Sequence, residues 1–243
     1  MRLHTFTKRC AQEILRDPLN LFFGLGFPVV LLLLLSAIQA NIPVDLFEIQ
    51  RLSPGITVFG LSFMTLFSAT LIARDRETSL LQRLYTTPLK PSDYILGYLI
   101  PMIPIAMVQS AICYLVAFLL GMPVTFNILG AILMIAPISG LYIGLGLLCG
   151  SVFNVKQVGG ICGALLTNLS AWLSGVWFDL ELVGGTFQKI ANCLPFVHAV
   201  KLEQAMVGGN WADGLPHLLP VLGYAIVIMV CAIFLFLRQM KNQ

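Results

Sequence analysis

Residues 19–38 read LNLFFGLGFPVVLLLLLSAI, twenty residues without a charged side chain. A helix of about 20 apolar residues is as long as the hydrocarbon core of a bilayer is thick. Pro28 lies inside the run, and prolines are tolerated in such helices because neighbouring helices satisfy the freed backbone carbonyl. The run therefore predicts a transmembrane helix and decides the fold class of the chain.

Five further apolar runs follow the first one along the chain. They lie at residues 56–73, 94–120, 126–148, 158–178 and 218–237. The composition agrees with membrane insertion, because 58% of the 243 residues are hydrophobic and 10% are charged, whereas soluble domains contain about 25% charged residues. The sequence thus predicts an all-α membrane protein with six transmembrane helices, built as one domain over residues 1–243.

Two shorter amphipathic regions flank these runs. In residues 3–17, Leu3, Phe6, Cys10 and Ile14 recur at spacings of three and four, opposite a basic and polar face. This pattern predicts an interfacial helix, with a solvated helix as the alternative. The connection 179–217 holds apolar stretches at 187–194 and 197–207 that are too short to span. They predict short re-entrant outer helices, and a surface loop with two amphipathic turns is the alternative.

The placement of Lys and Arg predicts the orientation, because cytoplasmic segments carry the excess of positive charge. With a cytoplasmic N-terminus, eleven of the fourteen basic residues lie inside and three lie outside. The three outside residues are Arg51, Lys189 and Lys201. Both termini of a multi-pass protein are therefore predicted to be cytoplasmic.

None of the six predicted spans contains an acidic, basic or histidine residue. Ion-coupled carriers usually hold the coupling ion on an ionisable group at membrane depth, so ion coupling is disfavoured but stays open. The sequence has no GxxxxGK[ST] loop, no HExxH and no cysteine pair with zinc spacing, and His4, His198 and His217 are far apart along the chain. It therefore predicts no catalytic residue, no metal site and no cofactor on this chain. Nor does any Lys/Arg cluster indicate nucleic acid.

The inside connection 74–93 carries a helical pattern of its own. Leu80, Leu81 and Leu84 form an apolar stripe. Asp75 and Glu77 lie at the start, where the helix dipole favours carboxylates, and Pro88 ends the pattern. A short charged helix of this kind suits insertion into a groove on a partner protein. A solvated linker helix is the alternative.

Glycines repeat at small-xxx-small spacing in the fourth and fifth predicted spans. They are Gly140, Gly144, Gly146, Gly150, Gly159 and Gly163. Such patterns let helix backbones approach closely. The contacts are either within one chain, which is the more numerous kind, or between two subunits.

Three stretches together resemble the permease subunit of an ABC-2 type ABC transporter. They are Arg16-Asp17-Pro18 with the first span, the segment from Arg76 to Pro88, and Leu173–Phe178 with residues 190–200. Ser79 and Asp179 depart from the residues usual in the family. The resemblance implies a plasma (inner) membrane protein of bacteria that pairs with a second permease copy as a homodimer or related heterodimer. It also implies two ABC ATPase subunits that carry ATP and Mg.

The resemblance also assigns roles to particular residues. The segment 76–88 becomes a cytoplasmic coupling helix seated on the ATPase, with Arg76, Glu77, Leu80, Leu81, Arg83, Leu84 and Pro88 as the contact residues. The first, second and fifth spans border the substrate path at the dimer axis, which points to Thr65, Ser68, Asn168 and Trp172. Asn168 and Trp172 are four apart and share one helix face.

The function expected is that of an export permease without chemistry of its own, driven by separate ATPase subunits and surrounded by membrane lipids. Apolar spans with sparse Ser, Thr and Asn suit an amphipathic drug, an antibiotic peptide or a lipid-like molecule. The alternatives are an ion-coupled or passive carrier, a permease that exports a polysaccharide or lipid-linked glycan, and an integral membrane enzyme acting on lipids.

Overall fold

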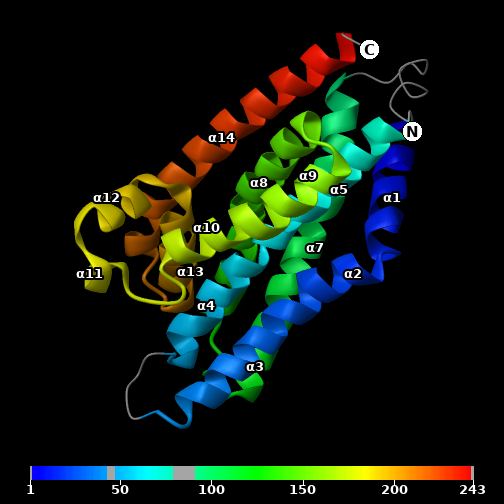
Figure 1. The fold of residues 1–243 in the computed structure, drawn as a ribbon. Coiled ribbons are helices and arrows are strands. Elements are labelled where there is room, and N and C mark those ends of the chain that lie inside the picture. The colour runs from blue at the N-terminus through cyan, green and yellow to red at the C-terminus, as the bar shows by residue number, and fades with distance from the viewer. Residues whose placement is uncertain (1, 43–46, 79–90, 242–243) are drawn as a thin grey trace.

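The computed structural model of the protein consists of helices packed side by side, most of them along one direction (Figure 1). It describes residues 2–42, 47–78 and 91–241, and these residues contain no β-strand. In chain order the elements are α1 (Arg2–Leu15), α2 (Pro18–Leu21), η1 (Phe22–Gly26), α3 (Phe27–Gln39), α4 (Ile49–Gly60), α5 (Ser62–Glu77), α7 (Pro91–Leu119), α8 (Asn127–Val152), α9 (Val155–Val158), η2 (Gly159–Leu166), α10 (Thr167–Ser174), α11 (Leu180–Val183), α12 (Gly185–Cys193), α13 (Pro195–Val207) and α14 (Trp211–Lys241), where η1 and η2 are π-helical. The predicted all-α fold is confirmed.

Five helical runs in the described residues are long and apolar enough to cross a membrane. They are Pro18–Gln39, Ile49–Glu77, Asp93–Leu119, Asn127–Val152 and Trp211–Arg238, and they cover five of the six predicted spans. The remaining predicted span, 158–178, corresponds to the consecutive elements α9, η2 and α10, which are interrupted by polar residues and glycines and are not among the five. The sixth crossing stays a prediction.

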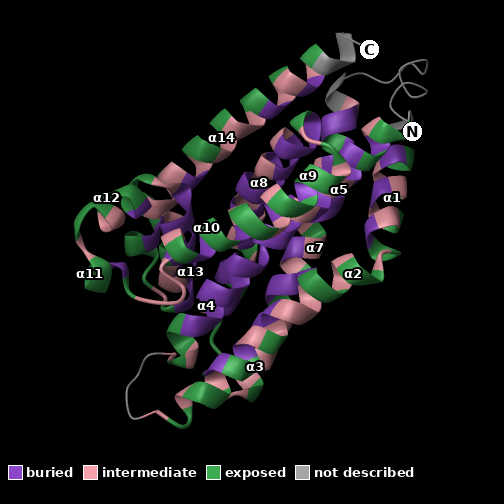
Figure 2. Cartoon of the chain, viewed as in Figure 1, coloured by how far each residue is buried: buried purple, intermediate pink, exposed green. Residues whose placement is uncertain are grey.

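The run Ile49–Glu77 forms the centre of the bundle. In its most apolar part 89% of the residues are buried, against 22% for Pro18–Gln39 and 11% for Trp211–Arg238. The same gradient is visible from purple to green in Figure 2. The two outer helices leave apolar side chains such as Leu34 and Ile226 exposed, so these faces need lipid or another chain to cover them.

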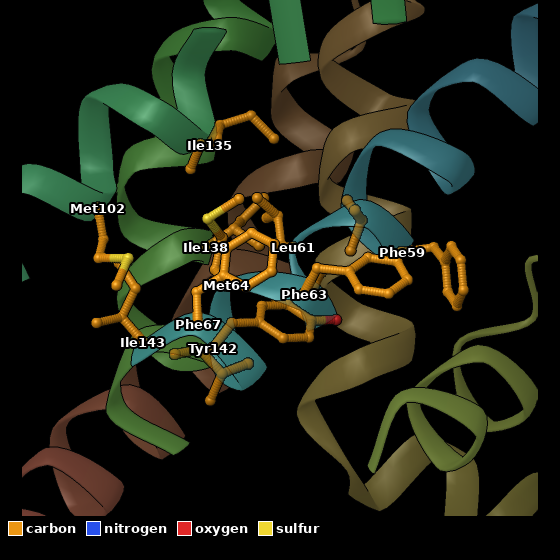
Figure 3. Packing of buried hydrophobic residues seen from close by; sticks show 14 of the residues in the cluster. Phe59, Leu61, Phe63, Met64, Phe67, Met102, Ile135, Ile138, Tyr142 and Ile143 are labelled. Atoms are coloured by element: carbon orange, nitrogen blue, oxygen red, sulfur yellow. The ribbon is translucent and has the colours of Figure 1, made fainter. Parts of the chain in front are cut away.

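The core is built where α5 packs on α8. Phe63, Met64 and Phe67 of α5 lie against Ile138 and Tyr142 of α8 in the packed cluster of Figure 3. Close packing of this kind makes the relative position of the two helices sensitive to single methyl groups.

Glycines on α8 allow this close approach. A Cβ atom on Gly146 would overlap the Ser68 hydroxyl, and one on Gly150 would lie 2.7 Å from the Ala69 carbonyl oxygen. A Cβ on Gly140 would meet nothing within 4 Å. The prediction of packing within one chain is therefore confirmed for Gly146 and Gly150, the residues that face α5.

The amphipathic helix α1 packs its apolar stripe on protein. Phe6, Cys10 and Ile14 are buried, and the Phe6 ring meets Tyr94 and Tyr98 of α7 edge to face, with centroids 5.8 and 5.1 Å apart. Burial raises the pKa of the Cys10 thiol to about 12, so the thiol stays protonated. Because α7 covers the stripe, the polar side of α1 is the side left for the membrane interface or for solvent.

Three short helices, α11 to α13, lie at the end of the molecule away from α1 (Figure 1). α12 and α13 coincide with the apolar stretches predicted to form outer helices. α13 packs against α14, α8 and α4, and its residues Val197, Val200 and Leu202 are buried. These helices therefore belong to the packed bundle, while their depth in a membrane stays a prediction.

Candidate functional site

A buried carboxylate holds the end of α5 that leads into residues 79–90. Asp75 is 1% exposed, and its two oxygens accept hydrogen bonds of 2.5 and 2.6 Å from the Arg9 guanidinium. The Tyr98 hydroxyl donates a third hydrogen bond to Asp75 at 2.8 Å. Arg9 lies on α1 and Tyr98 on α7, so this Asp75 cluster joins three helices at one point. Bidentate pairing of this kind offsets the cost of burying the charge.

The next two residues of α5 bind the turn between α8 and α9. Arg76 donates to the carbonyl oxygens of Gly150 at 2.7 Å and Phe153 at 3.3 Å. Glu77 accepts a hydrogen bond of 3.0 Å from the backbone N–H of Val155. The last carbonyls of a helix favour a cation, and the first N–H groups favour a carboxylate. This explains why a basic residue followed by an acidic one fits here.

The end of α5 is thus attached to α1, α7, α8 and α9 within a few residues. The contacts of Asp75 and Arg76 are buried or partly buried, whereas the Glu77–Val155 hydrogen bond is exposed. Of the predicted coupling residues, Arg76 and Glu77 make these contacts inside the chain. The others, Leu80, Leu81, Arg83, Leu84 and Pro88, lie outside the described residues, and the coupling role of the whole set stays a prediction.

The four residues predicted for the substrate path separate into two pairs. Thr65 and Ser68 are buried on α5, where the Thr65 hydroxyl donates to the Tyr142 carbonyl at 2.8 Å and the Ser68 hydroxyl donates to the Met64 carbonyl at 2.7 Å. Within this chain, these two hydroxyls face α8 and are satisfied by backbone. They line no open space in a single subunit.

The second pair lies on an open face of α10. Trp172 is 53% exposed, and Asn168 is exposed with its amide donating to the Ala164 carbonyl at 2.8 Å. The two side chains share one helix face, as predicted. A large aromatic ring and an amide left open in this way are available to a partner subunit, a lipid or a substrate.

A second buried carboxyl lies near the opposite end of the bundle. Glu203 on α13 is 0% exposed, and one of its oxygens accepts a hydrogen bond of 2.6 Å from the Tyr114 hydroxyl of α7. Burial raises the pKa of the Glu203 carboxyl to about 8. The neutral form is therefore favoured at neutral pH, and the pair joins α13 to α7 without a buried charge.

Two histidines that are far apart in the sequence meet between α13 and α14. The Nδ1 atoms of His198 and His217 lie 2.9 Å apart, and His198 Nε2 lies 3.0 Å from the Asn192 carbonyl oxygen. The two residues are 19 positions apart in the sequence, and the packing of α13 on α14 brings them together. Among the described residues, no group of three or more His, Cys, Asp or Glu side chains is arranged to hold a metal ion.

Sequence reasoning missed both buried carboxyls. Asp75 was placed at the start of a new helix, whereas α5 continues without a break to Glu77. Glu203 was placed in an outer connection. The one available signal was the tyrosine partners, since Tyr98 and Tyr114 are polar-tipped residues within a predicted apolar span, and a buried tyrosine hydroxyl usually has a partner.

These features define a multi-pass helical membrane protein whose central helix ends at the Asp75 cluster and whose described part contains no group of residues arranged to hold a metal ion. The chain belongs to the ABC-2 type transporter family, whose pattern matches residues 1–208. Proteins of this family are the membrane subunits of transporters and are generally not catalytic.

Two curated relatives agree with this assignment. The chain is 25% identical over 201 residues to the probable multidrug ABC transporter permease YbhS of Escherichia coli strain K12, and equally to the protein of the same name from Escherichia coli O157:H7. The alignment covers 78% of this chain and 50% of each relative. The chain thus spans about half the length of the curated relatives it matches.

Proposed function

We propose that this chain is the permease subunit of an ATP-driven exporter. A second permease copy, identical or related, completes the path, and two separate ATPase chains bind ATP and Mg²⁺. The name of the curated relatives supports an amphipathic drug-like cargo, with antibiotic peptides and lipid-like molecules as chemically similar candidates. The exposed apolar faces of Pro18–Gln39 and Trp211–Arg238 support a membrane-embedded subunit.

The observation that carries this proposal is the attachment of the α5 end. Asp75, Arg76 and Glu77 bind four other helices immediately before residues 79–90. A permease without ATP chemistry needs a mechanical contact with its ATPase, and a segment continuous with the central helix supplies one. Movement of that segment would shift the helices as rigid bodies between inward- and outward-facing states.

The position of the termini supports six crossings with both ends in the cytoplasm. The start of α1 and the last turns of α14 lie at the same end of the molecule (Figure 1), which agrees with an even number of crossings. Adding the run α9–η2–α10 to the five candidate spans gives six. The Asp75 cluster then lies on the cytoplasmic side, where an ATPase would bind.

Replacing Leu84 with Asp tests the coupling role. We expect the variant to bind the ATPase at least about tenfold more weakly, because the substitution places an unpaired charge in an apolar groove. Glu77→Ala is expected to leave the permease in the membrane but to cut substrate-stimulated ATP hydrolysis in the reconstituted complex. Leu84→Met is the matched control and should keep wild-type binding. If Leu84→Asp and Glu77→Ala both leave complex formation and stimulated hydrolysis unchanged, the segment is not the coupling helix.

Substituting the exposed pair on α10 tests the substrate path. Asn168→Ala and Trp172→Ala should change the relative export of amphipathic cations and neutral drugs by about tenfold, because each removes one class of contact, while the amount of protein in the membrane stays constant. Leu219→Ala, which truncates an exposed apolar residue of α14, is the control. If both variants export all tested compounds in the same proportions as the wild type, Asn168 and Trp172 serve helix packing and not the substrate path.

A further inference from the structure

A cavity of about 460 Å³ lies where α1 meets the beginning of the first candidate span. The charged residues of its lining are Arg9, Glu13, Arg16, Asp17 and Arg74. Three guanidinium groups and two carboxylates line the cavity, and Asp75, which is hydrogen-bonded to Arg9, adds a third carboxylate beside it.

Some of these charges already have partners. Arg9 is bound by Asp75 and by Glu13, whose carboxylate lies 2.5 Å from the guanidinium. Asp17 caps α2, where its side chain accepts hydrogen bonds from the backbone N–H groups of Leu19 at 3.2 Å and Asn20 at 3.3 Å. Both lining carboxylates are therefore occupied, and their oxygens are turned to groups of the protein.

The remaining two cations are open. Arg16 and Arg74 are exposed, and neither forms an ion pair with a carboxylate in the described part of the chain. Arg16 directly follows α1 and Arg74 lies on α5, and both residues line the same cavity. A planar guanidinium binds a phosphate or carboxylate through two parallel hydrogen bonds, so the two side chains form a cradle for an oxyanion.

The surroundings of the cavity indicate where this anion comes from. Pro18 lines the cavity and is also the first residue of the candidate span Pro18–Gln39, so the cavity lies at the level of the lipid headgroups. Leu19 and Phe22, at the start of that span, are 68% and 55% exposed. A smaller adjoining cavity shares Arg74 and adds the apolar side chain of Phe67. A polar cavity followed by exposed apolar residues matches the two parts of a phospholipid.

We propose that this cavity binds the phosphodiester headgroup of an anionic phospholipid in the leaflet that borders α1. Arg16 and Arg74 hold the phosphate oxygens, and the acyl chains run along Leu19 and Phe22. Because Arg74 precedes Asp75 directly, the bound lipid links α1 to α5 beside the Asp75 cluster. The membrane then supplies a contact that helps to fix the end of the central helix.

The test is lipid binding to the purified chain in detergent, together with its ATPase if the two purify as a complex. Bound lipid is counted by native mass spectrometry during titration with dioleoylphosphatidylglycerol, with dioleoylphosphatidylcholine or with inorganic phosphate. The test variant is Arg16→Gln/Arg74→Gln. The control is Lys8→Gln/Arg238→Gln, which removes the same charge from exposed residues of α1 and of the C-terminal part of α14, outside the cavity lining.

We expect wild-type protein to bind phosphatidylglycerol saturably. The affinity should be about tenfold or more weaker in the test variant, because each of the two cations contributes separately to binding the anionic headgroup. It should be less than about twofold weaker in the control. Phosphatidylcholine should bind more weakly than phosphatidylglycerol, and its affinity should differ little between the wild type and the two double variants. Equal losses in both variants, or no loss in the test variant, would overturn the proposal. So would displacement of phosphatidylglycerol by equimolar inorganic phosphate, which would make this a site for the free ion.

A folding control accompanies these titrations. The melting temperature in lipid-free detergent should be the same in the wild type and both double variants, because Arg16 and Arg74 are exposed and make no ion pair with the described residues. If the test variant unfolds, Arg16→Gln and Arg74→Gln are measured separately, each with an expected loss of about threefold to fivefold. Wild-type phosphatidylglycerol affinity in both single variants would equally refute the site.

Discussion

Replacement of Asp75 with alanine is expected to lower the free energy of unfolding by about 3 kcal/mol, the lower end of the range for breaking a buried ion pair. The substitution removes the acceptor of three hydrogen bonds, two from Arg9 and one from Tyr98. The Tyr98 hydroxyl is then left buried without this partner. Arg9 keeps its pair with Glu13 and is partly exposed, which is why we expect the lower end of the range.

Chemical denaturation of the purified protein in detergent measures this effect, with helix unfolding followed by circular dichroism. Glu13→Ala is the matched control, because it removes the other carboxylate that pairs with Arg9 but should cost only about 0.3–0.5 kcal/mol as a partly exposed i,i+4 pair. The double variant Arg9→Met/Asp75→Leu should regain most of the loss, since an apolar pair can replace a buried ion pair. If Asp75→Ala costs no more than Glu13→Ala, the Asp75 cluster does not hold α1 and α7 to α5.

The helical bundle could be predicted from the sequence because lipid imposes a simple requirement. Each long span needs about 20 apolar residues with internally bonded backbone, and the run at 19–38 shows this without reference to any other part of the chain. The apolar run 158–178 predicts a fifth span in the same way, but α9, η2 and α10 are not among the five long apolar helices, so this span stays a prediction. The polar residues Lys156, Gln157 and Asn168 make the helical run Val155–Ser174 less apolar than the other five.

The charged contacts could not be predicted in the same way, since their partners are distant in the sequence. Asp75 pairs with Arg9, 66 positions away, and Glu203 pairs with Tyr114, 89 positions away. Local pattern assigned Asp75 to the beginning of a helix because carboxylates favour that position. The structure shows that a buried carboxylate can instead lie near a helix end when a guanidinium from another helix pairs with it.

The sequence indicated that α8 packs closely on another helix, but it did not show which of its glycines lie at the contact. The glycine spacing indicated helix packing without showing which glycines face a partner. In the structure Gly146 and Gly150 face α5, whereas Gly140, on the same helix, meets nothing within 4 Å. Only the rotation of α8 about its axis decides between them, and that rotation is set by side chains on α5 and α14 together.

Adding a methyl group at Gly150 is therefore expected to destabilise the protein, whereas the same change at Gly140 of the same helix should not. The Cβ of Gly150→Ala would lie 2.7 Å from the Ala69 carbonyl oxygen, 2.9 Å from the Ala69 Cα and 3.0 Å from the Ile72 Cβ. Two of these atoms are backbone, so relief requires α5 and α8 to separate. Such overpacking costs typically about 1–3 kcal/mol, and Gly150→Val should cost more.

Gly140→Ala is the control, because it adds the same methyl group to the same helix in open space. Without a clash, it keeps the gain of up to about 1 kcal/mol that alanine has over glycine in a helix. We expect the two variants to differ by about 2–4 kcal/mol in the free energy of unfolding in detergent, with Gly150→Ala the less stable. Equal stabilities would mean that α5 and α8 are not in backbone contact at Gly150, and the central packing described here would then be wrong.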